Sequence, residues 1–161
     1  MVSGAQPGVT TYATPNDREV VITRVVDAPR HLVFEAWTNP KYIPRWLAPM
    51  DWTMPVCEMD ARPGGKWRYV YRKGDGSEMV LSGTVREVSP PERLVSTESW
   101  GPEWPETVNT LRLTEIAGRT TVTLTVTYPS KEARDAALQS GMKDGLEEGF
   151  AKLDALVATL R

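Results

Sequence analysis

The sequence predicts an α+β domain in which a curved antiparallel sheet of about seven strands wraps around one long C-terminal helix. Two observations support this prediction. The run from Gly141 to Leu160 places its apolar residues in one stripe at 3.6 residues per turn, which is typical of an amphipathic helix. Between Thr53 and Tyr128 the pattern alternates with a period of two and is interrupted by short turns, which favours antiparallel strands joined by hairpins. A single long helix after such a sheet is expected to lie across its apolar face.

The C-terminal helix carries an apolar stripe and a row of glycines beside it. The apolar residues are Met142, Leu146, Phe150, Leu153, Leu156, Val157 and Leu160. Because an interior helical glycine costs about 1 kcal/mol relative to alanine, we expect Gly145 and Gly149 either to keep space open or to let another element approach closely. Gly141 is expected to belong to the helix start, after a break at Ser140.

The segment before the alternating region is predicted to hold one strand and two short helices. Residues 1–17 are rich in Gly, Thr, Ser and Pro, which is typical of a flexible arm, so residues 18–161 are expected to form the single domain. The predicted elements are a strand at Glu19–Val26, a helix at about Pro29–Trp37 and a brief helix within residues 40–48.

Turns rich in Gly and Pro divide the alternating region into six predicted strands. They are Thr53–Asp60, residues 67–72 and 79–86, Arg93–Trp100, Thr107–Ile116 and Thr120–Tyr128. In the second of them Trp67, Tyr69 and Tyr71 share one face, and the other face is largely basic. Pro129-Ser130 is expected to begin a further helical segment.

Composition excludes several functional classes. The net charge of -2 and pI near 5.5 give no basic footprint for nucleic acid, and the apolar runs are too short for a membrane span. No signal peptide is expected at the N-terminus. Cys57 and His31 are the only residues of their types, so we expect no internal disulfide, no metal centre and no cofactor, and a reducing cytoplasmic location.

Four segments of the chain resemble one known family. They are VITRVVDAPRHLVFEAWTNP (21–40), CEMDARPGGKWRYVYRKGDG (57–76), SGTVREVSPPERLV (82–95) and GMKDGLEEGFAKLDALV (141–157). They are similar to the proteins that resemble the C-terminal domain of the activator of the Hsp90 ATPase, within the START/Bet v 1-like (SRPBCC) superfamily. The resemblance runs from about residue 18 to the end and implies a helix-grip fold. Where family members often have Trp-Trp-Gly-Pro, this chain has Trp46-Leu47-Ala48-Pro49, which alters the rim of any pocket.

The resemblance implies three functional hypotheses. The first is non-catalytic binding of a small hydrophobic molecule in a cavity between the sheet and the C-terminal helix. The second is an interaction module that contacts a chaperone such as Hsp90, with a possible role in the stress response. The third is an enzyme of the polyketide cyclase/dehydratase kind. A monomer and a homodimer are both compatible with the sequence.

A lining for the implied cavity is available in the sequence. The expected ligand-binding residues are Trp46, Trp67, Tyr69, Tyr71, Met79, Leu81, Gly83, Glu98, Trp100, Met142, Gly145, Leu146 and Phe150. Gly83 and Gly145 would leave room for a ligand. Alternatively, the same residues close a packed core and the glycines permit tight contact.

Few polar residues are candidates for chemistry. A carboxylate in an apolar pocket would have a raised pKa and could transfer protons, but the pattern leaves open which faces Glu98 and Arg112 occupy. Asp60 and Cys57 are further candidates, and Cys57 is expected to be a small buried residue rather than a nucleophile. His31 is expected on the surface. The basic residues Lys66, Arg68, Arg72, Lys73 and Arg86 are expected to form a solvated outer face or a contact patch for an acidic partner.

Overall fold

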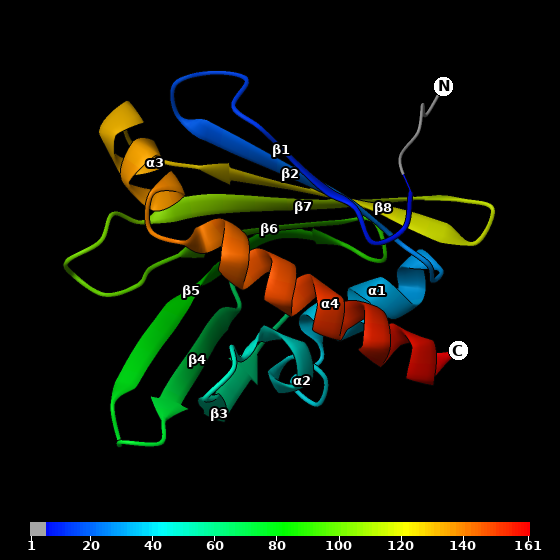
Figure 1. Cartoon of the computed structure of the whole chain (residues 1–161), viewed down its shortest axis with the longest axis horizontal. Coiled ribbons are helices and arrows are strands. Elements are labelled where there is room, and N and C mark those ends of the chain that lie inside the picture. The colour runs from blue at the N-terminus through cyan, green and yellow to red at the C-terminus, as the bar shows by residue number, and fades with distance from the viewer. Residues whose placement is uncertain (1–5) are drawn as a thin grey trace.

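The computed structural model describes residues 6–161 and shows one open sheet crossed by a long helix (Figure 1). The strands are β1 (Thr10–Ala13), β2 (Glu19–Val26), β3 (Trp52–Met59), β4 (Lys66–Lys73), β5 (Glu78–Ser89), β6 (Arg93–Glu98), β7 (Thr107–Ile116) and β8 (Arg119–Thr127). The helices are α1 (Arg30–Thr38), α2 (Pro44–Leu47), α3 (Lys131–Leu138) and α4 (Met142–Leu160). The predicted helix-grip arrangement, with two short helices after the Glu19–Val26 strand, is confirmed.

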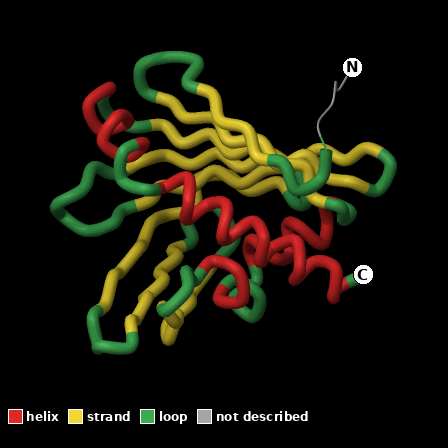
Figure 2. The backbone as a smooth tube through the Cα atoms, viewed as in Figure 1, coloured by secondary structure: helices red, strands yellow, loops and turns green. Residues whose placement is uncertain are grey.

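The sheet is antiparallel throughout and its strand order is β1-β2-β8-β7-β6-β5-β4-β3. It has eight strands, one more than expected, because residues 10–13 of the predicted flexible arm pair with β2 as an edge strand. In Figures 1 and 2 the strands β3, β4 and β5 splay away from the others, and α4 crosses the angle between the two groups.

The core lies between the inner face of the sheet and the helices. In α4 the C-terminal half is the buried part, through Phe150, Leu153, Leu156 and Val157. The backbone of this helix packs most closely against α1 and α2, and an alanine Cβ at Gly149 would come 3.5 Å from the carbonyl oxygen of Trp46. The apolar stripe predicted for this helix is therefore the one that the fold uses. The contact of an added Cβ at position 149 with Trp46 would be an ordinary van der Waals contact, so the approach of α2 does not require Gly149.

The boundary between α3 and α4 follows local backbone chemistry. The Ser130 hydroxyl accepts a hydrogen bond from the Ala133 N–H and caps α3. Gly141 precedes α4 with φ of 84°, a left-handed conformation that favours glycine. The predicted break before the long helix is confirmed. Over residues 6–161, no helix is both long and apolar enough to cross a membrane.

Candidate functional site

Solvent reaches the inner face of the sheet near its middle. Along β8, Val122 and Val126 point inward and are buried, whereas Leu124 between them is only half-buried. Its neighbours in the register, Ile22 and Leu111, are 1% and 2% exposed. A side chain that points into the fold can be reached by solvent only from inside, so space remains between this part of the sheet and α4.

The same open region exposes polar side chains on β6 and β7. Asn109 lies two residues from the buried Leu111 and therefore shares its inward face. Glu98 lies two and four residues after Ser96 and Leu94, and it therefore shares the inward face of the buried Leu94. Both are half-buried, and the Nδ2 of Asn109 donates to Oε1 of Glu98 at 3.0 Å. This assignment settles the facing of Glu98, which points inward. Arg112 has the opposite parity and is exposed on the outer face.

Glu98 is partly reached by solvent and is nevertheless surrounded by protein. Burial raises the pKa of its carboxyl above the usual range, and hydrogen bonds from Asn109 and Trp100 lower it by less. Desolvation therefore outweighs hydrogen bonding at this carboxyl. A group of this kind is expected in a narrow recess rather than on an open surface.

Three tyrosines lie near enough to the carboxyl to be affected by its charge, Tyr69 and Tyr71 on β4 and Tyr128 directly after β8. Burial is the largest cause that raises the pKa of Tyr69, Tyr71 and Tyr128, and the charge of Glu98 raises each of them further. Tyr128 has a pKa of about 12, so its hydroxyl stays protonated at neutral pH and can donate. The lining expected from the sequence contains neither Tyr128 nor Asn109. Both could have been found from the alternation of their strands, because Tyr128 has the same parity as Val122 and Val126, and Asn109 has the same parity as Leu111.

The N-terminal half of α4 faces this region without filling it. Met142 and Leu146 are half-buried, whereas Phe150 one turn further along the same stripe is 1% exposed. The hydroxyl of Tyr128 lies 3.8 Å from the sulfur of Met142. Gly145 is exposed, and an alanine Cβ there would meet no atom within 4 Å, so the helix is open to solvent at this position. We call the space bounded by Glu98, Asn109, Leu124, Met142 and Leu146 the inner recess.

The other expected ligand-binding residues occupy different environments. Tyr69, Tyr71 and Leu81 are buried on the inner face, and Met79 beside them is half-buried. Trp46 is 3% exposed, and its Nε1 donates to the carbonyl of Ala36, so it belongs to the packing between helices. Trp100 is 42% exposed and, because it also hydrogen-bonds to Glu98, it lies at the rim of the inner recess.

Gly83 does not keep a cavity open, contrary to the first hypothesis for this residue. An alanine Cβ there would lie 1.9 Å from the carbonyl oxygen of Thr97 and 2.5 Å from Nε1 of Trp67. The indole N–H of Trp67 donates to that carbonyl at 3.0 Å, and the N–H of Thr84 donates to the hydroxyl of Thr97 at 3.0 Å. The first bond connects β4 to β6 and the second connects β5 to β6, between the pairs Val85–Ser96 and Ser82–Ser99. Gly83 thus permits a tight contact, as the alternative interpretation expects.

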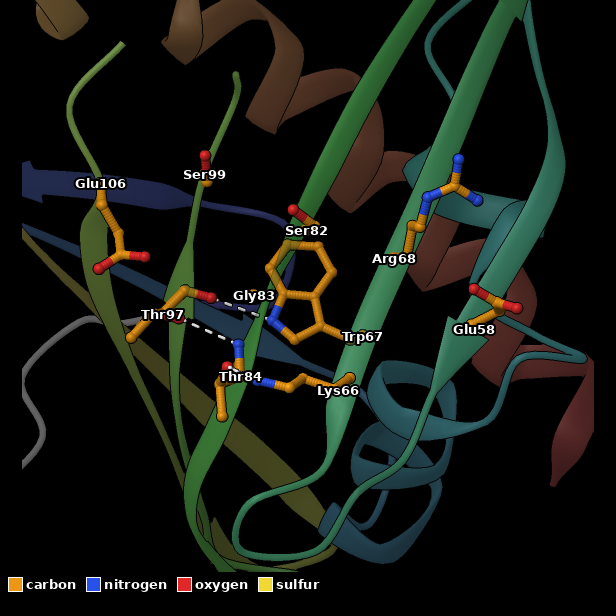
Figure 3. Close-up of a pocket in the computed structure, with 10 residues that line it drawn as sticks. All are labelled: Glu58, Lys66, Trp67, Arg68, Ser82, Gly83, Thr84, Thr97, Ser99 and Glu106. Carbon is orange, nitrogen blue, oxygen red and sulfur yellow. Dashed lines mark hydrogen bonds between the residues drawn. The ribbon is translucent and has the colours of Figure 1, made fainter. Parts of the chain in front are cut away.

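A separate hollow of about 570 Å³ lies on the outer face at this junction (Figure 3). Its lining is Glu58, Lys66, Trp67, Arg68, Ser82, Gly83, Thr84, Thr97, Ser99 and Glu106. Lys66 donates to the hydroxyl of Thr84 at 3.1 Å, most of the lining residues are polar or charged, and the hollow is open to solvent. We refer to it as the outer hollow. It lies on the opposite side of the sheet from the inner recess.

The remaining candidates for chemistry are not arranged for catalysis. Burial raises the pKa of Cys57 to about 11, so its thiol is protonated at neutral pH and is a poor nucleophile. Asp60 is exposed and pairs with Arg62 at 2.8 Å. His31 is exposed, as expected. Within the described residues 6–161, no three His, Cys, Asp or Glu side chains are grouped so as to hold a metal ion.

The fold is that of a helix-grip domain, and comparison with known proteins identifies its family. The family model described as activator of Hsp90 ATPase homolog 1-like protein matches residues 27–158. The chain belongs to this family. Comparison with curated protein sequences gives no match.

Solved structures of bacterial proteins share this fold. A protein from Rhodobacter sphaeroides is 30% identical, with a TM-score of 0.89, and the match covers 95% of this chain and 100% of that one. Ms6760 from Mycobacterium smegmatis is 23% identical, with a TM-score of 0.82 over 92% of this chain and 97% of that one. An AHSA1-like protein from Aeromonas hydrophila is 23% identical, with a TM-score of 0.69 over 84% and 93%.

Proposed function

We propose that the protein binds a small hydrophobic molecule in the inner recess without transforming it. The observation that carries the proposal is the contrast along α4 and β8. Phe150 and Val122 are sealed, whereas Leu146, Met142 and Leu124 leave apolar surface accessible on the inside of the fold. Apolar surface left open inside a domain is stabilised when a ligand covers it, by about 25 cal/mol for each Å² removed from water.

The recess also has the polar composition of a binding site. Ligand sites are concave and mostly apolar, with a few polar groups that fix the orientation of the ligand. Here Glu98, Asn109 and Tyr128 supply those groups among apolar side chains from the sheet and α4. Trp100 lies at the rim. The proposal therefore needs no catalytic residue and no bound metal.

Filling the recess with an indole tests the proposal. We expect Leu146→Trp to weaken binding of an environment-sensitive apolar fluorophore by about tenfold or more, because the larger side chain occupies the space that the fluorophore needs. The measurement is a fluorescence titration of wild type and variant. The control is Ala151→Trp, which places the same side chain on the exposed face of the same helix and is expected to leave the affinity unchanged.

Unchanged fluorophore affinity in a folded Leu146→Trp variant would show that the recess is not the binding site. Circular dichroism melts establish folding. Leu146→Ala provides a second measurement, because it enlarges the recess and is expected to alter the affinity without adding bulk. Native mass spectrometry of protein from its own host would then identify a co-purifying ligand and the stoichiometry together.

A contact with a chaperone is the second candidate function, and one surface feature favours it. Trp104, in the loop between β6 and β7, is 53% exposed, and Trp100 at the start of that loop is 42% exposed. Tryptophan is enriched in protein interfaces and is costly to leave in water. The family description names an activator of the Hsp90 ATPase, and the single cysteine suits the cytoplasm, where we expect this protein to meet such a chaperone.

A turnover assay tests this second function. We expect the protein to raise the ATPase rate of an Hsp90-type chaperone and Trp104→Ala to reduce that increase severalfold, with Ile116→Ala as a control at another exposed apolar position. An ATPase rate that does not change when the wild-type protein is added would exclude this second function.

A further inference from the structure

Among residues 6–161, Glu98 has hydrogen-bond donors around it but forms no ion pair. Asn109 donates to one carboxylate oxygen at 3.0 Å, and Trp100 is a second donor. The charge of Glu98 raises the pKa values of Tyr69, Tyr71 and Tyr128, none of which is a cation. A carboxylate taken out of water without a cation is costly, and a paired one is much less so.

The cations on the inward face of β2 and on the helices α3 and α4 are engaged elsewhere. Arg24 points inward from β2, but it binds Asp154 at 2.5 Å and Glu147 at 3.4 Å. On α4, Lys143 lies over the ring of Tyr12 with its Nζ 4.9 Å from the ring centroid. Lys152 pairs with Glu148 at 3.2 Å. Arg134 on α3 donates to the carbonyl of Asn16 and to Asp135. None of these four residues therefore supplies a cation to the inner recess.

We propose that the ligand of the inner recess is a hydrophobic amine, whose ammonium group pairs with the carboxylate of Glu98 while its apolar body lies against Leu124, Met142 and Leu146. This inference rests on the proposed binding function and specifies the class of ligand. The aromatic rings of Tyr69, Tyr71 and Tyr128 add to it, because aromatic side chains around a carboxylate are a favourable environment for an organic cation.

A hydrophobic carboxylic acid fits the same recess poorly. Its charge would repel the carboxylate of Glu98, and no cation of the recess would compensate it. A neutral alcohol can donate one hydrogen bond to Glu98 but leaves the charge unpaired. The pairing thus distinguishes molecules that have the same apolar body and differ in one polar group, by about tenfold or more for a charge-assisted contact.

The pH dependence of amine binding follows from the groups that surround Glu98. Burial raises the pKa values of Tyr69 and Tyr71 on β4, and Tyr128 after β8 has a pKa of about 12, so all three are neutral at pH 7. Cys57 on β3, which interacts with Tyr69 and Tyr71, has a pKa of about 11 and is neutral as well. The side chains of α4 that bound the recess, Met142 and Leu146, do not titrate. Only Glu98 ionises below neutral pH, and its ionised form binds the ammonium. The affinity is therefore expected to increase as pH rises through the pKa of Glu98.

The experiment compares two probes of one shape, 1-naphthylmethylamine and 1-naphthylmethanol, by isothermal titration calorimetry at several pH values. We expect the amine to bind about tenfold or more tightly than the alcohol at pH 7 and to lose that preference at acidic pH. Glu98→Gln is expected to abolish both the preference and its pH dependence. Glu58→Gln, which removes the same charge from the outer face, is expected to retain them.

The outcomes separate this inference from the binding function itself. Equal affinity of the wild type for amine and alcohol overturns the amine assignment and leaves the recess as an apolar site. A preference that persists in a folded Glu98→Gln variant overturns it as well. Binding of neither probe, together with unchanged fluorophore binding in Leu146→Trp, overturns the inner recess as a ligand site.

Discussion

At the scale of single residues, the junction between β5 and β6 depends on the absence of one methyl group. The carbonyl of Thr97 receives the indole N–H of Trp67 directly beside Gly83, at a place where the two strands are joined through side chains. Because the nearest atom to an added Cβ is a backbone oxygen, neither partner can move aside without shifting a strand. The sequence showed a glycine on the inner face of a strand but did not show what lies against it.

Gly83→Ala is therefore expected to lower the free energy of unfolding by about 1–3 kcal/mol, the usual cost of overpacking. Urea denaturation measures the loss. Gly74→Ala provides the control, because a Cβ at this turn residue would meet no atom within 4 Å and it is expected to change stability little. Equal stability of the two variants would contradict the tight contact at Gly83.

At the scale of elements, a buried arginine joins β2 to α4. The Arg24 side chain is 5% exposed and binds Asp154 and Glu147, whose side chains are 36% and 48% exposed. Its guanidinium also lies 5.3 Å from the ring centroid of Phe150. This link holds α4 to β2, next to the edge strand β1. Neither the strand pattern nor the helix pattern predicts it, because it joins residues 130 positions apart.

Arg24→Met is expected to cost about 1–3 kcal/mol of unfolding free energy. This is less than the 3–5 kcal/mol of a fully buried pair, because water can rehydrate the two carboxylates that remain. The control is Arg119→Met, which removes an exposed pair with Asp27 and is expected to cost less than about 1 kcal/mol. Chemical denaturation of both variants measures the difference, and losses of equal size would show that burial does not strengthen the link.

At the scale of the whole molecule, the sequence predicts the architecture well and the site only in part. Alternation and turn residues predict where the strands lie along the chain, and the apolar stripe of α4 predicts which face of that helix packs against the rest of the fold. The edge strand β1 was missed because its four residues lie among Gly, Thr and Pro and are ordered by pairing with β2. Such pairing is a tertiary effect that local pattern does not contain.

The sequence predicts which residues of the candidate site point to the inner face, because this depends on alternation along a strand. It does not predict how deeply those residues are buried. Tyr69, Tyr71 and Leu146 follow from periodicity, and Asn109 and Tyr128 could have been found by extending the same parity along β7 and β8. The inward position of Glu98 needed the register of β6 against β7. Whether a side chain in the middle of a sheet is sealed or accessible, as Leu111 and Leu124 differ, depends on how closely α4 approaches, which no local pattern reports.

The contact of Gly83, Trp67 and Thr97 has a consequence for the divergence of related sequences. A side chain larger than glycine at position 83 is costly, since it meets both the carbonyl of Thr97 and the indole of Trp67. Because the backbone carbonyl lies nearest, loss of the indole alone would not make room, and a chain that acquires a larger residue must respace β5 and β6, which also disturbs the hydrogen bond of the Trp67 indole. Changes at positions 67 and 83 are therefore expected to occur together. Descendants that keep the tryptophan inherit the glycine with it.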